Sequence, residues 1–144
     1  MIRVGIVGAT GYTGQELIHI LLGHPEVKIT YLSRSNKADT SVISDILPLF
    51  KNRLNLICGP TDIKTIIPKC DLVFLALPHT ASMDIVPRLI LAGKKVIDLS
   101  ADYRIKNTKL YRDFYHKEHR DRSNLKQAVY GLPELYRNKI KGAQ

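Results

Sequence analysis

Apolar positions change their spacing at a glycine-rich boundary near the start of the chain. The run Ile2–Val7 is rich in β-branched residues and ends at a glycine, which is typical of a buried strand. The next segment predicts a helix over Tyr12–Leu22, which a Gly-His-Pro sequence ends. The apolar side chains expected on one face of this helix are Leu17, Ile20 and Leu21.

Weaker patterns continue this alternation of extended and helical segments. Val27–Leu32 predicts a second strand, and Leu54–Cys58 predicts a third. Between them, Ser41–Arg53 is expected to be irregular, with Pro48 inside it. Ile63–Ile67 predicts a short helical or loop segment.

A clearer signal follows. Asp71–Leu77 is almost entirely apolar, as expected for a strand that is covered on both faces. His79–Ala92 predicts a helix, and Lys95–Leu99 predicts another strand. The helix residues expected to face inward are Met83, Val86, Leu89 and Ile90.

The order of these elements predicts the fold class. Strands that alternate with helices pair in parallel through right-handed crossovers. We therefore expect a single α/β domain over residues 1–144: a doubly wound, mostly parallel Rossmann-type sheet with helices on both faces. Beyond Arg104 the alternation is lost, and we expect long loops with one helix, Leu110–His116.

Composition narrows the class of protein. Hydrophobic residues make up 44% of the chain and charged residues 24%, as in a globular domain. There is neither an apolar run near the roughly 20 residues that span a bilayer nor a signal-peptide pattern, so we expect a cytoplasmic protein without membrane contact. Acids are mixed into the basic stretch that dominates the net charge of +9, which favours a solvated or subunit-facing surface over nucleic-acid binding.

The sequence Gly-Ala-Thr-Gly-Tyr-Thr-Gly at positions 8–14 joins the first predicted strand to the first predicted helix. Glycines there permit a tight turn and a close approach to a pyrophosphate, which free N–H groups and the helix dipole attract. Extended short-chain dehydrogenases and semialdehyde dehydrogenases share this GxxGxxG spacing, and a purely structural turn is the alternative. The residues expected to contact a dinucleotide are Gly8, Thr10, Gly11, Tyr12, Thr13 and Gly14.

The end of the second predicted strand indicates which dinucleotide binds. An NAD-binding domain usually carries Asp or Glu about 20 residues past the glycines, where it binds the ribose 2′-hydroxyl. Here the sequence reads Ser33-Arg34-Ser35, and the first acid is Asp39. A guanidinium between two hydroxyls suits a 2′-phosphate, so we predict NADP rather than NAD. The alternative is an ordinary exposed arginine.

Two further strands end in polar residues at the edge of the sheet where ligands bind in such folds. His79 follows one of them and could orient the nicotinamide or a substrate anion. Ser100 and Asp102 follow the other and could touch the cofactor, and Arg104 could meet a substrate carboxylate or phosphate. The alternative for each is a satisfied polar loop residue.

Residues for catalysis or metal binding form no complete pattern. His116 and His119 lie three apart without cysteine partners, so a solvated helix face is favoured over a metal site. Cys58 and Cys70 have no neighbouring base or helix N-terminus, and we expect both to be inert thiols. We therefore predict neither a catalytic residue nor a metal site in this chain.

Several segments, in order along the chain, resemble one family. Together with the glycine loop, Leu75–His79, Val96–Arg104 and Tyr130–Leu135 resemble N-acetyl-gamma-glutamyl-phosphate reductases. Aspartate-semialdehyde dehydrogenases share the fold and the loop, but the Pro-His pair at 78–79 and Tyr130–Leu135 favour the first family. The resemblance covers essentially the whole chain.

The resemblance implies an enzyme of arginine biosynthesis that uses NADPH to reduce N-acetyl-gamma-glutamyl phosphate to the semialdehyde, through a cysteine thioester and a histidine acid–base partner. We expect that cysteine, and a catalytic and dimerisation domain, to lie beyond this sequence, which would be inactive alone. The full-length enzyme is expected to be a homo-oligomer. The implied contacts are Ser33, Arg34 and Ser35 for the 2′-phosphate, Leu77, Pro78 and His79 beside the nicotinamide, and Arg104 for the substrate.

Other functions stay open at this point. A non-catalytic NADP sensor would fold alone and bind a partner through its basic C-terminal residues. An aspartate-semialdehyde dehydrogenase-like enzyme, or a short-chain sugar-nucleotide enzyme, would use the same cofactor loop. If a second domain is absent, we expect exposed apolar surface to promote association.

Overall fold

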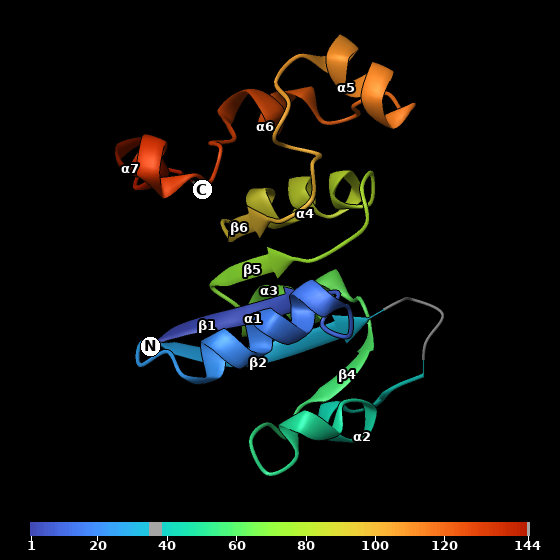
Figure 1. Ribbon diagram of the computed structural model, residues 1–144, viewed down its shortest axis with the longest axis vertical. Coiled ribbons are helices and arrows are strands. Elements are labelled where there is room, and N and C mark those ends of the chain that lie inside the picture. The colour runs from blue at the N-terminus through green and yellow to red at the C-terminus, as the bar shows by residue number, and fades with distance from the viewer. Residues whose placement is uncertain (35–38, 144) are drawn as a thin grey trace.

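The computed structural model describes residues 1–34 and 39–143. Six strands within them form one sheet in the order β3-β4-β2-β1-β5-β6 (Figure 1). Neighbouring strands are parallel except for β3 and β4, which are antiparallel. The predicted mostly parallel, doubly wound sheet is therefore confirmed. The strands are β1 (Ile2–Val7), β2 (Val27–Arg34), β3 (Ser41–Val42), β4 (Ile57–Pro60), β5 (Leu72–Leu75) and β6 (Lys95–Asp98).

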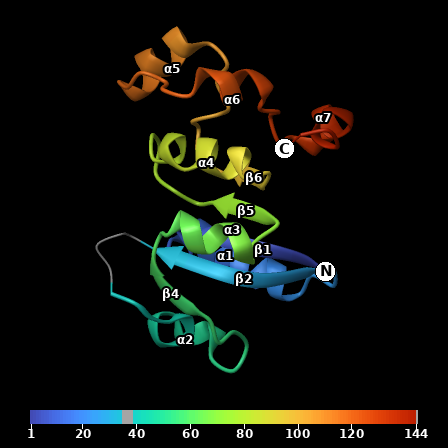
Figure 2. The same cartoon turned by 180° about the vertical axis from the view of Figure 1, so that it is seen from behind.

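Helices cover both faces of the sheet, as predicted. Figure 1 shows α1 in front of β1 and β2, and the reverse view in Figure 2 shows α3 on the opposite face. The helices are α1 (Tyr12–Leu22), α2 (Ile43–Ile46), α3 (Ile63–Lys69), α4 (Val86–Leu91), α5 (Thr108–Tyr115), α6 (Arg122–Gln127) and α7 (Pro133–Ile140). Two 3-10 turns, η1 (Pro48–Phe50) and η2 (Ser82–Asp84), complete the set.

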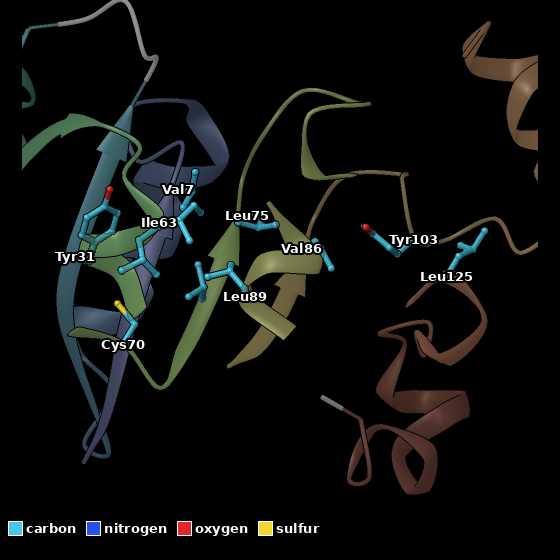
Figure 3. Close-up of a cluster of buried hydrophobic side chains, with 11 residues drawn as sticks. Val7, Tyr31, Ile63, Cys70, Leu75, Val86, Leu89, Tyr103 and Leu125 are labelled. Atoms are coloured by element: carbon cyan, nitrogen blue, oxygen red, sulfur yellow. The ribbon is translucent and has the colours of Figure 1, made fainter. Parts of the chain in front are cut away.

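Two apolar clusters hold the layers together, because successive side chains of a strand point to opposite faces of the sheet. In β1, Val4 and Ile6 belong to the cluster beneath α1, whereas Val7 belongs to the cluster beneath α3 and α4. In β5, Val73 and Leu75 join this second cluster, part of which Figure 3 shows. The other side chains of β5 pack against the first cluster, so the strand is covered on both faces, as predicted.

In the first part of the chain, the bounds of α1 match the prediction, but its buried face, the start of one strand and the structure of Ser41–Arg53 differ from it. In α1, Ile18 and Leu21 are buried, whereas Ile20, expected on the inner face, is 61% exposed. The strand predicted at Leu54–Cys58 is β4, which begins three residues later than predicted, at Ile57. The region predicted as irregular, Ser41–Arg53, contains β3, α2 and η1.

The predicted helix His79–Ala92 is wrong over its first part. Residues 79–81 are not helical, η2 is a short 3-10 turn, and α4 begins only at Val86. The backbone N–H groups of Thr80 and Ser82 donate to the carboxylate of Asp102, which draws this part of the chain away from helical pairing. Of the residues expected to face inward, Met83, Val86 and Leu89 are buried, and Ile90 is partly buried.

The prediction of one helix after Arg104 is also wrong, because the described residues there form three. α5 covers most of the expected helix, and α6 and α7 are additional. Local capping sets their starts: Asp121 Oδ1 accepts from Asn124 N at 3.2 Å, and Pro133 occupies the first turn of α7. No residue of α7 is buried, so no apolar stripe marks this helix in the sequence.

Candidate cofactor site

The carboxyl ends of β1, β2 and β5 meet at one edge of the sheet, beside the reversal of strand order at β1. Gly8 N and Ala9 N both donate to the carbonyl of Ser33, at 2.9 and 2.8 Å, which ties the loop after β1 to the end of β2. Ala76 N donates to the carbonyl of Val7 at 2.8 Å and brings the loop after β5 to the same place. Ligands of open parallel sheets bind in the crevice at such a reversal.

Two of the three loop glycines are required by the packing of the protein itself. A Cβ on Gly8, whose φ is +89°, would lie 2.2 Å from the carbonyl oxygen of Ala76. A Cβ on Gly14 would lie 2.2 Å from the carbonyl oxygen of Gly8 and 2.7 Å from Cα of Ala9. These glycines let α1 and the loop after β5 pack closely, and neither alone indicates a ligand.

Gly11 differs, because nothing in the described part of the chain crowds it. A Cβ there would lie 3.6 Å from the carbonyl oxygen of Gly8, an ordinary contact. Gly11 is the exposed N-cap of α1, and no described side chain caps the N–H groups of the first turn. The missing side chain leaves this backbone open to close approach, and the positive end of the helix dipole favours an anion.

The other predicted loop residues surround this helix end. Tyr12 and Thr13 are exposed, and their backbone N–H groups belong to the first turn of α1. The carbonyl of Thr10 accepts from Nε2 of Gln15 at 2.9 Å, which braces the loop. The sequence analysis missed Gln15. The one feature that could have indicated its role is a side-chain amide in the first part of the helix, within reach of the loop.

The end of β2 presents the predicted 2′-phosphate residues in different ways. Ser33 is fully buried, and its Oγ lies 3.0 Å from Oγ1 of Thr61, so this side chain supports the loop. Arg34 is partly exposed, and its Nε donates to the carbonyl of Asp39 at 3.0 Å. Ser35 lies outside the described residues. Of the described pair, Arg34 is therefore the side chain available to a ligand.

The loop after β5 carries the second group of predicted cofactor residues. Leu77 packs against the cluster beneath α3 and α4, whereas Pro78 and His79 are exposed. Nδ1 of His79 accepts from Ala101 N at 3.3 Å, and the ring centroid lies 4.9 Å from that of Tyr115. This acceptor role of Nδ1 places the proton of the neutral imidazole on Nε2.

Ser100 forms its hydrogen bonds within the protein. Its Oγ donates to Oδ2 of Asp98 at 2.8 Å and accepts from Asp102 N at 3.1 Å. Asp98 also accepts from Oγ of Ser82 at 2.8 Å. Burial raises the pKa of the Asp98 carboxyl, and the hydrogen bonds from the two serines oppose that rise. These contacts join the loop after β6 to η2.

Asp102 is fully buried and connects distant segments. Its carboxylate accepts from Thr80 N at 2.8 Å, from Ser82 N at 3.2 Å and from Oη of Tyr111 at 2.7 Å. No local sequence pattern singles out Tyr111, because its hydrogen-bond partner lies outside its own helix. Asp102 is thus too enclosed for the direct cofactor contact considered from the sequence.

The prediction of a solvated position for His119 is wrong, because His119 is 2% exposed. Its Nε2 lies 2.7 Å from the carbonyl oxygen of Asp102, and its ring packs edge-on against Tyr103 and Tyr111. His116, in contrast, is exposed at the C-cap of α5. The described ranges contain no group of three or more His, Cys, Asp or Glu that could hold a metal ion.

Both cysteines are buried free thiols. Burial raises the pKa of the Cys58 thiol and of the Cys70 thiol, which favours the neutral form of each. Because the thiolate is the reactive species, neither side chain suits a nucleophile.

Arg104 lies beside a cavity of about 590 Å³ at the outer edge of β6. Its guanidinium carbon lies 5.9 Å from the centroid of the Tyr130 ring. Two apolar residues of the cavity wall, Ile97 and Leu99, are 40% and 38% exposed. The cavity brings together residues of Val96–Arg104 and Tyr130–Leu135, two of the segments that carry the family resemblance. The guanidinium can bind an anionic group, and the apolar floor can cover the rest of an organic ligand.

The exposed candidates thus form one line along the carboxyl edge, from Arg34 at the end of β2, through the first turn of α1 after β1, to Pro78 and His79 after β5. Ser33, Ser100 and Asp102 lie behind this line and support it. Within the described part of the chain, no helix combines the length and apolarity needed to cross a membrane.

Comparison with known proteins fits this geometry. Residues 3–143 match the family described as semialdehyde dehydrogenase, NAD binding domain. The N-acetyl-gamma-glutamyl-phosphate reductase of Synechocystis sp. is 47% identical over 99% of the chain, and that of Desulfotalea psychrophila is 46% identical over 100%. The chain spans 40% and 41% of the length of these two curated relatives.

Solved structures show the same fold. An aspartate semialdehyde dehydrogenase with NADP from Candida albicans superposes with a TM-score of 0.63 at 27% identity, covering 72% of this chain and 31% of its own. Aspartate semialdehyde dehydrogenase II from Vibrio cholerae superposes with a TM-score of 0.54 at 18% identity, covering 72% of this chain and 29% of its own. The second likeness concerns the fold alone.

Proposed function

This chain belongs to the family of semialdehyde dehydrogenase NAD-binding domains, and we propose that it is the NADP-binding portion of an N-acetyl-gamma-glutamyl-phosphate reductase. Relatives of that name are 46–47% identical over the whole chain, whereas the Candida albicans aspartate semialdehyde dehydrogenase is 27% identical over 72%. The proposed reaction reduces N-acetyl-gamma-glutamyl phosphate to the semialdehyde, with a hydride that NADPH supplies when bound. Residues 1–144 act as one cofactor-binding domain in this proposal.

The observation that carries the choice of NADP is Arg34 at the end of β2. In NAD-binding domains this strand end usually carries an acid, which would repel a 2′-phosphate. Here the partly exposed guanidinium stands there, and its Nε is anchored on the carbonyl of Asp39 at 3.0 Å. The structural neighbour from Candida albicans was solved with NADP, which agrees with this choice.

The remaining contacts follow from the exposed line of residues. The pyrophosphate would lie on the first turn of α1, where the backbone N–H groups of Tyr12 and Thr13 face it and Gly11 permits its approach. The nicotinamide would lie beside Pro78 and His79. Ser33 and Gly14 would act through the loop that they support and not by direct contact.

The substrate side of the proposal rests on Arg104. An acyl phosphate is anionic, and Arg104 places a guanidinium beside the cavity at β6. Both cysteines of this chain are buried with raised pKa values, so the nucleophile would come from the further length that the relatives possess. The full-length enzyme would be a cytoplasmic homo-oligomer, and the partly exposed Ile97 and Leu99 are surfaces that further protein could cover.

Fluorescence titration with NADPH and NADH tests the cofactor. We expect the wild-type chain to bind NADPH more tightly by about tenfold or more, since a charge-assisted contact to a phosphate is worth about 1.5–3 kcal/mol. Arg34→Ala should weaken NADPH by a similar factor and leave NADH unchanged.

Arg53→Ala is the matched control, because Arg53 is also exposed but follows η1 away from the strand ends. It should leave both affinities unchanged. Equal affinity of the wild type for NADH and NADPH would rule out the NADP preference. Binding of neither dinucleotide would rule out the cofactor role.

A further inference from the structure

The backbone immediately after His79 is strained. Thr80 has a φ of +76°, in the left-handed region that β-branched residues rarely adopt. Such conformations persist only where surrounding contacts hold them, and they are frequent at functional sites. The turn that presents Pro78 and His79 therefore needs a restraint from elsewhere in the protein.

Asp102 provides that restraint. Its Oδ1 accepts from Thr80 N at 2.8 Å, and its Oδ2 accepts from Ser82 N at 3.2 Å, so the two oxygens hold the turn at both ends of a three-residue stretch. Asp102 is fully buried, and none of the ion pairs among the described residues includes it. A buried carboxylate without a cation depends on hydrogen bonds for its stability.

Tyr111 supplies a third donor to the same carboxylate. Its Oη lies 2.7 Å from Oδ1 of Asp102, and its ring is fully buried. Burial and this hydrogen bond both raise the pKa of Tyr111, so the hydroxyl keeps its proton and continues to donate. The carboxylate is thereby fixed from α5 while it fixes the turn.

The His79 ring is placed by the same two segments. Its Nδ1 accepts from the backbone N–H of Ala101, the residue before Asp102. Its ring lies 4.9 Å from that of Tyr115, which in turn lies 4.9 Å from that of Tyr111. Backbone and ring are thus both oriented by the loop after β6 and by α5.

We propose that Asp102 is a positioning residue, which holds the strained turn at 78–82 so that Pro78 and His79 face the nicotinamide half of the cofactor. Asp102 does not touch the cofactor. The identity of that ligand rests on the proposed function, whereas the restraint on the turn rests on the hydrogen bonds to Thr80 and Ser82. The pyrophosphate and 2′-phosphate contacts lie on α1 and β2, outside this network, so loss of Asp102 should affect one half of NADPH.

Asp102→Asn tests the proposal with little change of shape. An amide can accept on one side only, so one of the donors now aimed at the carboxylate faces an N–H group. We expect the Kd of NADPH to rise about tenfold, while the Kd of 2′,5′-ADP, which lacks the nicotinamide, stays within about twofold. Equal rises for both ligands, or no rise for either, would overturn the proposal.

Two matched variants separate the turn from the aromatic cluster. Tyr111→Phe removes one donor to Asp102 but leaves the bonds to Thr80 and Ser82, so its effect on NADPH should be smaller than that of Asp102→Asn. Tyr103→Phe removes a hydroxyl that donates to Asp121 at 2.7 Å in the same cluster, without touching the turn. Tyr103→Phe should leave the Kd values of NADPH and 2′,5′-ADP unchanged. A rise in the Kd of NADPH as large as that of Asp102→Asn would contradict the role assigned to Asp102.

Amide hydrogen exchange followed by NMR gives a readout without cofactor. In Asp102→Asn, exchange at Thr80 and Ser82 should accelerate about tenfold, while amides of β1 stay unchanged. Unchanged exchange at the Thr80 and Ser82 amides would overturn the proposal that Asp102 restrains the turn. This outcome can be read even if the wild-type protein binds no dinucleotide and the proposed function fails. Should Asp102→Asn not fold, Thr80→Gly/Asp102→Asn removes the strain, since glycine tolerates positive φ. That double variant should fold, and its failure to do so would count against strain at Thr80 as the cause.

Discussion

The sheet region, residues 2–98, and the C-terminal segment, residues 105–143, are held by different forces. Among the described residues, the twelve largest fully buried side chains include eleven from the sheet region and one, Tyr111, from the C-terminal segment. The C-terminal segment is attached mainly by hydrogen bonds to Asp102 and by ring contacts of His119 with Tyr103 and of Tyr115 with His79. Tyr103 and Leu125 extend the apolar cluster on that side (Figure 3).

This difference divides the cofactor edge as well. The proposed phosphate-binding part, α1 and the end of β2, is supported by the two apolar clusters of the sheet region. The proposed nicotinamide part, the turn around His79, is supported by contacts that reach into α5. The first should therefore survive changes in the C-terminal segment that disturb the second.

The largest effect is expected from truncation inside the sheet region. Leu75 is fully buried in the cluster beneath α3 and α4, so Leu75→Ala should lower the free energy of unfolding by about 2–5 kcal/mol through lost burial and a cavity. Urea denaturation followed by circular dichroism measures this change. Leu91→Ala is the control, because Leu91 is 90% exposed and its loss should cost less than about 0.5 kcal/mol. Similar values for both variants would show that the cluster does not stabilise the region.

Gly11→Ala separates binding from folding within the sheet region. A Cβ at Gly11 meets no close atom of the described protein, so the melting temperature should stay near that of wild type. It would stand where the pyrophosphate approaches, and the Kd of NADPH should rise about tenfold, or about 1.4 kcal/mol. Gly14→Ala, which places a Cβ 2.2 Å from a backbone oxygen, should instead impair folding. Unaltered NADPH binding by Gly11→Ala would place the phosphates elsewhere.

Tyr111→Ala should release the C-terminal segment while the sheet region remains folded. The global free energy of unfolding should fall by about 1 kcal/mol, less than for Leu75→Ala, because the segment can open separately. Limited trypsin digestion should then cleave within residues 105–143 about tenfold faster and leave the sheet region protected. Leu135→Ala, at an exposed position of α7, should keep the wild-type digestion rate. Simultaneous loss of all protection in Tyr111→Ala would mean that the two regions unfold as one.

The same contrast explains which parts of the fold the sequence predicted. Strands and helices of the sheet region bury apolar faces, and burial leaves a periodic pattern that can be read directly. α7 buries none of its residues, so its helix leaves no such pattern. The start of α6 is set by a hydrogen bond from Asn124 N to Asp121. In the sequence, this capping residue cannot be distinguished from other polar residues of the same region.

The candidate site divides in the same way. Gly11 and Arg34 were identified because their place at a strand end or helix start is a local property of the sequence. The role of Asp102 was not identified, because its hydrogen-bond partners Thr80 and Tyr111 lie 22 and 9 residues away in the sequence, respectively. His119 was misjudged for the same reason, because its burial depends on a contact 17 residues back along the chain.

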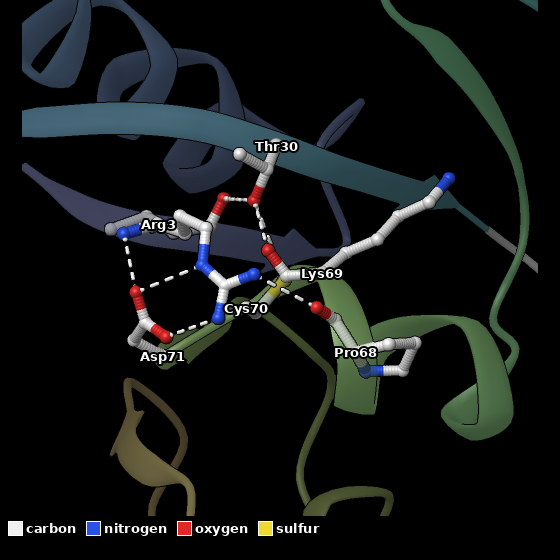
Figure 4. A network of polar contacts seen from close by, with 7 residues as sticks. Arg3, Thr30, Pro68, Lys69, Cys70 and Asp71 are labelled. Atoms are coloured by element: carbon white, nitrogen blue, oxygen red, sulfur yellow. Dashed lines mark hydrogen bonds and ion pairs between the residues drawn. The ribbon is translucent and has the colours of Figure 1, made fainter.

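The smallest expected effect concerns the ion pair at the opposite edge of the sheet. Arg3 at the start of β1 donates to Asp71 from Nη2 at 2.6 Å and from Nε at 3.1 Å (Figure 4). This hydrogen bonding lowers the pKa of Asp71 to about 2. A carboxyl whose pKa is lower in the folded state stabilises the protein above its unfolded pKa, near 3.9, and loses that contribution as the pH falls towards 2.

Asp71→Asn should therefore lower the melting temperature slightly at pH 7, where the contribution is fully present, and flatten its decline between about pH 4 and pH 2 by the same small amount. The effect is small because both side chains are about half exposed and solvent weakens the pair. Asp45→Asn, at an exposed carboxylate of α2, should keep the wild-type slope. Because the ion pair joins β1 to the residue before β5, it acts on the sheet region alone, and trypsin cleavage within residues 105–143 should not change at pH 7. An increase in that cleavage would show that the C-terminal segment depends on this edge of the sheet as well as on Tyr111.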